Sequence, residues 1–93
     1  MPYSITMYST EWCGDCRNAK RFLKSYNIQF AEIDIDRDES AAQRVIDWSG
    51  GRRVIPTFDI RGIDGKQVIL HNPRLPELEH VLGVHNEQSN GQN

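Results

Sequence analysis

The chain has 93 residues, of which 38% are hydrophobic and 26% are charged, and this suits one small globular domain. Its 11 basic and 13 acidic residues give a net charge of −2, which argues against a nucleic-acid-binding protein because such proteins carry a basic excess. No apolar run is long enough to span a bilayer, and Met1–Ser4 lacks the basic and apolar segments of a signal peptide. We therefore expect a soluble, cytoplasmic monomer with no nucleic-acid or membrane partner.

The first half of the chain alternates strand and helix patterns. Residues 4–8 alternate polar and apolar side chains and predict a first strand. Residues 14–26 place their apolar side chains on one helical face, and Asn27 can end this helix in a left-handed conformation. Residues 29–35 predict a second strand.

The second half predicts one further strand–turn–strand unit between two helices. Ser40 and Gln43 have capping-box spacing, which places a helix start at Ser40, and Gly50-Gly51 ends that helix. Residues 54–60 and 66–70 predict two strands joined by a turn, and a last helix follows Asn72-Pro73.

This order, β-α-β-α-β-β-α, predicts an α/β fold with a four-stranded mixed sheet and helices on both faces. Residues 1–84 would form the domain. The polar segment 85–93 would be a disordered tail.

The only two cysteines lie three residues apart, in Cys13-Gly14-Asp15-Cys16. Two cysteines are too few for a disulfide-stapled mini-protein or for a zinc site made of four thiolates. A bridge across so short a loop also constrains the unfolded chain very little. The cysteine pair therefore points to redox chemistry.

The placement of the pair is more informative than its spacing, because it follows a predicted strand and opens a predicted helix. Cys13 would then lie at the N-cap, where free backbone N–H groups and the helix dipole favour a thiolate. Thiols in such positions have pKa values of about 3.5–7.5 instead of about 8.5. Cys16, one turn further on, would be buried and protonated, and could resolve a mixed disulfide formed on Cys13.

Two other interpretations of the cysteine pair remain. It could be half of a metal site completed by a histidine, but His71, His80 and His85 are distant, and the last two lack the usual metal-helix spacing. It could also be purely structural. We expect no metal in this chain.

Pro56, within Ile55-Pro56-Thr57, is the second informative feature. A proline in a strand pattern is ordinarily an edge-strand or bulge residue. The alternative is a cis peptide bond that presents the backbone of Ile55 beside Cys13, where an extended thiol peptide could pair with it. Sequence alone favours a trans bond.

Three segments together resemble the small actinobacterial-type glutaredoxins, the mycoredoxin group: Thr10–Cys16, Val54–Thr57 and Asn72-Pro73. The resemblance implies a thioredoxin fold, a cis proline at Pro56, Cys13 as the nucleophile and Cys16 as the resolving thiol. It also implies disulfide-containing client proteins and no bound cofactor. Electrons would come from a low-molecular-weight thiol, mycothiol-like or glutathione, or from a flavoprotein reductase.

Several positions depart from the glutaredoxins that use glutathione. Thr10 stands where these usually carry a basic residue, and His71–Arg74 replaces their Gly-Gly and acidic residue. Glu11 and Asp15 add two carboxylates that would oppose the helix dipole and repel an anionic thiol, unless both are merely solvated surface charges. We therefore expect a reducing partner without net negative charge.

Further site candidates flank the cysteine pair. Trp12 would be exposed and would cover one side of the site, and Trp48 would be structural. Arg52 and Arg53 could contact a substrate carboxylate or could simply be solvated. The expected substrate-binding set is Trp12, Asp15, Val54, Ile55, Pro56 and Asn72.

The sequence thus predicts a thiol–disulfide oxidoreductase. One alternative is a redoxin that is fed by thioredoxin reductase and donates electrons to ribonucleotide reductase. Another is an iron–sulfur cluster carrier, against which the intact Cys16 argues. The third is a redox-inert binding module on the same fold.

Overall fold

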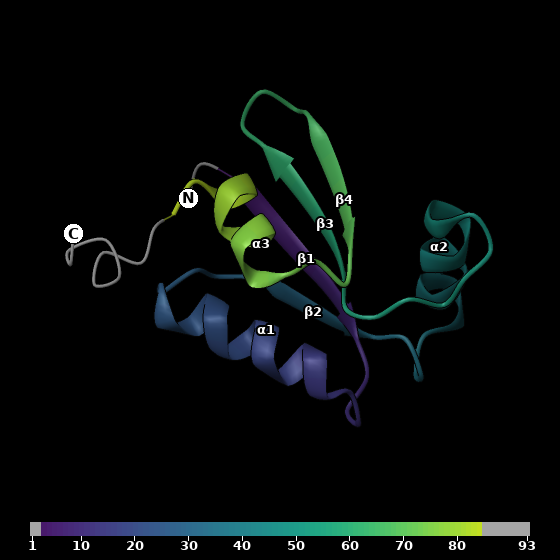
Figure 1. Ribbon diagram of the computed structural model, residues 1–93. Helices are drawn as coiled ribbons and strands as arrows, with labels where there is room; N and C mark the ends of the chain where they lie inside the picture. Colours follow the sequence, from purple (N-terminus) through teal and green to yellow (C-terminus); the bar gives the residue numbers. More distant parts are fainter. Residues whose placement is uncertain (1–2, 85–93) are drawn as a thin grey trace.

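The computed structural model describes residues 3–84 and has the predicted order of elements (Figure 1). The strands are β1 (Tyr3–Ser9), β2 (Ala31–Asp34), β3 (Thr57–Gly62) and β4 (Gln67–His71). The helices are α1 (Gly14–Ser25), α2 (Glu39–Ser49) and α3 (Leu75–Leu82). The predicted tail over residues 85–93 lies outside the described residues.

The four strands form one mixed sheet in the order β2-β1-β3-β4. β1 runs parallel to β2, and the other two neighbouring pairs are antiparallel. Tyr8, near the end of β1, pairs with Ile33 of β2 and with Thr57, the first residue of β3. The segment that follows β1 and the segment that precedes β3 therefore meet at the same end of the sheet.

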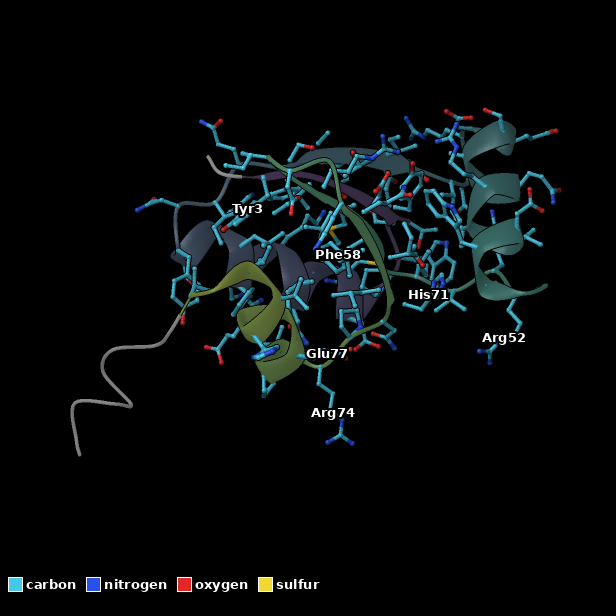
Figure 2. All side chains as sticks on the ribbon, turned by 90° about the horizontal axis from the view of Figure 1, so that it is seen from above. Tyr3, Arg52, Phe58, His71, Arg74 and Glu77 are labelled. Atoms are coloured by element: carbon cyan, nitrogen blue, oxygen red, sulfur yellow. The ribbon has the colours of Figure 1, made fainter. Side chains whose placement is uncertain are left out.

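Helices cover both faces of the sheet, as predicted: α1 and α3 lie together on one face and α2 lies on the other (Figure 1). The larger core cluster lies under α1 and α3 and includes Phe58, which is fully buried (Figure 2). The smaller cluster lies under α2. There Trp48 packs edge-on against Tyr8, with ring centroids 5.5 Å apart, so its predicted structural role is confirmed.

Two strands begin two or more residues later than predicted, whereas β4 begins one residue later. β2 begins at Ala31 instead of residue 29, and β3 begins at Thr57 instead of residue 54. Pro56 has no N–H to give to a ladder, and the carbonyl of Val54 accepts a hydrogen bond from the Thr57 hydroxyl at 2.8 Å, so this segment turns instead of pairing. The Ile55–Pro56 peptide bond is cis, as the family resemblance implied.

The predicted start of the second helix is wrong, whereas the predicted end of the first is confirmed. The N-cap of α2 is Asp38, whose carboxylate accepts hydrogen bonds from the Ala41 amide at 3.0 Å and from the Ser40 hydroxyl at 2.8 Å. A carboxylate two residues earlier replaces the Ser40 hydroxyl as the cap because it also complements the helix dipole. Asn27, after α1, has the predicted left-handed backbone, with φ of 58°.

Within residues 3–84, the structure contains no helix with the length and apolar character that crossing a membrane requires.

Substitution tests whether Asp38, and not Ser40, is the N-cap of α2. We expect Asp38→Ala to lower the midpoint of thermal unfolding by roughly 4–8 °C, as the loss of one N-cap does in a domain of this length. Ser40→Ala is the matched control and should change the midpoint far less. Because the Ser40 hydroxyl and the Ala41 amide lower the pKa of Asp38, the difference between wild type and Asp38→Ala should persist at neutral pH and disappear as the pH falls through that lowered pKa. Equal effects of the two substitutions would contradict the assignment.

Candidate active site

Cys13 caps helix α1 directly after the loop that leaves β1. Its backbone is extended, with φ of −85° and ψ of 115°, and its Sγ accepts a hydrogen bond from the Cys16 amide at 3.0 Å. The predicted N-cap position is therefore confirmed. Cys13 is only 7% exposed, so neighbouring residues cover most of it.

Cys16 lies one turn further along α1 and is fully buried. Burial, together with the hydrogen bond and the charge of Cys13, raises the pKa of Cys16 to about 12, although the Thr10 backbone and Lys20 oppose this shift. Cys16 is therefore a protonated thiol at neutral pH. Both cysteines are buried, but Cys13 keeps a small exposed fraction and Cys16 keeps none. The buried, protonated thiol predicted for Cys16 agrees with its burial and raised pKa.

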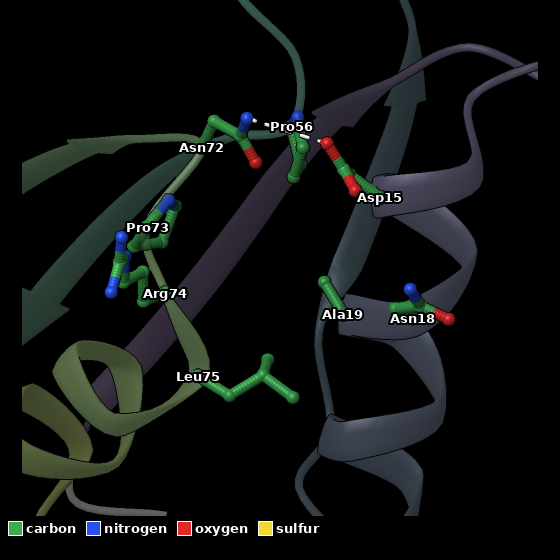
Figure 3. A pocket seen from close by; sticks show the side chains of 8 residues that line it. All are labelled: Asp15, Asn18, Ala19, Pro56, Asn72, Pro73, Arg74 and Leu75. Carbon is green, nitrogen blue, oxygen red and sulfur yellow. Dashed lines mark hydrogen bonds between the residues drawn. The ribbon is translucent and has the colours of Figure 1, made fainter.

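A groove of about 370 Å³ opens beside the start of α1 (Figure 3). Its walls come from α1, from Pro56 and from the loop before α3. The lining residues are Asp15, Asn18, Ala19, Pro56, Asn72, Pro73, Arg74 and Leu75. The structure thus brings together three of the predicted substrate-binding residues, namely Asp15, Pro56 and Asn72.

Two hydrogen bonds of Asn72 hold this groove in shape. Its backbone N–H donates to the carbonyl of Pro56 at 2.7 Å, and its side-chain amide donates to the Asp15 carboxylate at 3.4 Å. Figure 3 shows the Asn72 and Asp15 side chains facing each other beside Pro56. Asn72 has a left-handed backbone, with φ of 45°, a conformation that asparagine tolerates better than most residues.

The groove carries both signs of charge. Asp15 supplies a carboxylate on the α1 side, and Arg74 supplies a guanidinium on the α3 side and extends into solvent (Figure 2). Ala19, Pro56 and Leu75 provide apolar surface between them. Arg74 was not among the predicted site residues, although it belongs to the segment in which this chain departs from the glutathione users.

Trp12 lies outside the groove. Its side chain is exposed as predicted, at 65%, and its indole N–H donates to the carboxylate of Asp36 at 2.8 Å. Arg53 donates to the other carboxylate oxygen of Asp36 at 2.9 Å and to the carbonyl of Ile35 at 3.2 Å. The Arg53 guanidinium is thus paired within the protein, whereas Arg52 points away from it (Figure 2).

The two carboxylates next to the cysteine pair are not equivalent. Glu11 forms an ion pair with Arg37 at 3.1 Å, so its charge is largely offset. Asp15 instead contacts the neutral amide of Asn72. The action of these carboxylates against an anionic thiol stays a prediction, and the ion pair with Arg37 weakens it for Glu11.

Val54 and Ile55 are half-buried and precede Pro56. The Thr57 hydroxyl donates its one proton to the Val54 carbonyl, so His71 Nδ1, 2.9 Å from Thr57 Oγ1, must carry a proton and donate to it. Sequence reasoning missed this pair and considered His71 only as a metal ligand. In the part of the chain that the structure describes, no three potential metal-ligating side chains come together.

Known proteins resemble this chain over most of its length. The Glutaredoxin family model matches residues 5–64, a range that includes both cysteines and Pro56. A Mycobacterium tuberculosis protein that bears the glutaredoxin name is 36% identical over 79 residues, which is 85% of this chain and 89% of that protein. Mycoredoxin 1 of Corynebacterium glutamicum is 36% identical over 75 residues, 81% of this chain and 87% of its own length. The crystal structure of the thioredoxin-like protein BC3987 has a TM-score of 0.65 at 26% identity and covers 83% of this chain and 97% of its own.

The difference between the cysteines predicts selective alkylation. We expect iodoacetamide at neutral pH to add one group to the folded, reduced protein, at Cys13, because Cys16 is buried and protonated. Peptide mass spectrometry would locate the adduct. Folded Cys13→Ser is the control and should remain unlabelled over the same time, and both cysteines should react in denaturant. Two adducts on the folded wild type would contradict the assignment.

Proposed function

Since this chain belongs to the glutaredoxin family of thiol–disulfide oxidoreductases, we propose that Cys13 is its nucleophile and Cys16 its resolving thiol. The proposed substrates are protein disulfides and mixed disulfides between proteins and small thiols. The hydrogen bond from the Cys16 amide to Cys13 Sγ carries this proposal, because an amide donor at a helix start stabilises a sulfur anion.

The first proposed step is attack by the Cys13 thiolate on one sulfur of the substrate disulfide. A bond forms between Cys13 Sγ and that sulfur, the substrate S–S bond breaks, and the other sulfur leaves as a thiolate.

The second proposed step is attack by Cys16 on Cys13 Sγ, which releases the substrate as a thiol and leaves a Cys13–Cys16 disulfide. Cys16 must lose its proton first. Burial, the largest cause of the raised pKa of Cys16, persists in the mixed disulfide, whereas the hydrogen bond with Cys13 and the charge of Cys13 no longer raise that pKa. The first step therefore prepares Cys16 for the second, because its pKa falls when Cys13 is consumed.

Two electrons must then return to the cysteine pair. Two molecules of a small thiol can supply them and leave as their own disulfide, or a flavoprotein reductase can deliver them. No resident cofactor is needed, because thiol exchange alone moves the electrons.

We further propose that the small thiol carries no net negative charge, as mycothiol does not. Thr10 is buried where a basic residue would attract an anion, and Asp15 places a carboxylate at the groove. Arg74 lines the same groove and adds a positive charge to it, so this preference should be moderate. The match to a relative named mycoredoxin supports the same choice.

Substitution of each cysteine tests the proposed roles. Cys13→Ser should abolish reduction of a mixed disulfide, because no other described thiol can reach the substrate. Cys16→Ser should instead accumulate a covalent adduct between Cys13 and a client protein in cell extract, visible by non-reducing electrophoresis and mass spectrometry. An active Cys13→Ser protein would refute the proposal.

Asp15→Asn tests the thiol preference. We expect it to raise glutathione-driven turnover of a mixed disulfide about two- to fivefold, the range for one exposed charge, and to leave turnover with a neutral thiol nearly unchanged. Glu11→Gln is the matched control, because Glu11 is also a carboxylate two residues from Cys13. It should raise glutathione-driven turnover less, since Glu11 is already paired with Arg37. Faster wild-type turnover with glutathione than with the neutral thiol would overturn the preference.

A further inference from the structure

Asp36 joins the loop before the cysteine pair to the segment before Pro56, and neither it nor its two partners line the groove. Its carboxylate accepts the indole N–H of Trp12 through one oxygen at 2.8 Å and the guanidinium of Arg53 through the other at 2.9 Å. Trp12 belongs to the loop before α1, and Arg53 belongs to the segment before Pro56. One carboxylate thus fixes both segments to the turn that follows β2.

We propose that Asp36 is a positioning residue that holds the Trp12 indole as a fixed platform for protein disulfides, and that small disulfides do not use this platform. The preferred client is an extended protein segment with an apolar side chain beside its cysteine. This inference rests on the proposed role of Cys13 as nucleophile.

The bonds of Asp36 restrict Trp12 although most of the indole is in solvent. An indole that is 65% exposed would ordinarily sample several rotamers, and binding a partner would then cost the entropy of fixing it. The charge-assisted hydrogen bond to Asp36 fixes the ring beforehand. The turn is itself braced, since the Asp36 amide donates to Asp34 at 2.9 Å and Arg37 pairs with Glu11.

Asp36 is well suited to hold both donors at once. Arg53 and the Trp12 indole lower the pKa of Asp36, so the carboxylate is ionised at neutral pH. With Arg53 and Arg37 paired to carboxylates, the exposed indole is the main apolar feature on this side. Aromatic side chains of this kind dominate the binding energy of protein contacts, which is why the platform favours an apolar neighbour.

The small-thiol groove lies elsewhere. None of its lining residues is Trp12, Asp36 or Arg53. A small disulfide held in the groove would lie beside Asp15, two residues from Cys13, whereas a polypeptide extends on both sides of its reacting sulfur and must also pass over the neighbouring surface. The two classes of substrate should therefore respond differently to loss of Asp36.

The test compares two mixed disulfides of thionitrobenzoate in single turnover with the reduced full-length protein. One carries a hexapeptide with leucines on both sides of its cysteine, and the other carries hydroxyethanethiol. Cys13 bonds to the peptide or hydroxyethyl sulfur, and coloured thionitrobenzoate leaves with the electron pair of the broken bond. No recycling thiol is needed, so its identity does not affect the result.

We expect Asp36→Asn to raise the half-saturating concentration of the leucine peptide about five- to tenfold, with an unchanged limiting rate, as for loss of one hydrogen bond to a charged group. Its rate with the hydroxyethyl substrate should match the wild type. Asp47→Asn is the control: it removes the same charge from an exposed α2 carboxylate that contacts only Gln43, and should change neither substrate.

Trp12→Phe keeps an aromatic ring but removes the indole N–H, and it leaves the Asp36–Arg53 pair intact. It should reproduce much of the rise in the half-saturating concentration of the leucine peptide. The double variant Trp12→Phe/Asp36→Asn should have a half-saturating concentration no higher than that of the more affected single variant. This variant also keeps the inference testable if Asp36→Asn lowers stability.

If Asp36→Asn weakens the reaction with both substrates equally, or with neither, the proposed platform is overturned while the proposed nucleophile stands. Additive effects in the double variant would overturn it as well. A wild-type protein that releases no thionitrobenzoate from either substrate would instead refute the proposed function itself.

Discussion

The hydrogen bond from the Cys16 amide to Cys13 Sγ is the contact on which the whole site depends. It exists because helix α1 begins at Cys13, and the first amides of a helix have no acceptor within it. The same helix start separates the two cysteines by one turn, so Cys13 keeps a small exposed fraction and Cys16 is fully buried. A single local feature therefore supplies the anion-stabilising donor and the difference between the two thiols.

The sheet determines what this helix start faces. β1 pairs on both sides, and its end lies beside the start of β3. Pro56 directly precedes β3 and Asn72 directly follows β4, so antiparallel pairing brings them together, and their backbones bond at 2.7 Å. Three segments distant in the sequence thus converge at the start of α1 because of strand register, and Asp15, Pro56 and Asn72 line one groove there.

Local patterns made the order of elements and the N-cap position of Cys13 predictable, because helical period and strand alternation are properties of neighbouring residues. The start of α2 was predicted wrongly because two residues near it could both act as caps, and only the extended backbone of Asp38 selects between them. The contacts of Asp36 and His71, and the place of Arg74 in the groove, had no local signal. Asp36 bonds a residue 24 positions away, and His71 bonds one 14 positions away.

The partners of the charged residues also could not be predicted from neighbouring residues, and these partners explain why the two sides of Cys13 differ. The sequence places Glu11 and Asp15 symmetrically about the cysteine, yet Arg37 offsets one and a neutral amide contacts the other. One side is consequently a polar groove with charges of both signs, and the other is an exposed indole above paired charges. In the proposed reaction Cys13 must meet a protein and a small thiol in turn. Because different residues form the two sides, the affinity for each partner can be altered without changing the sulfur that serves both.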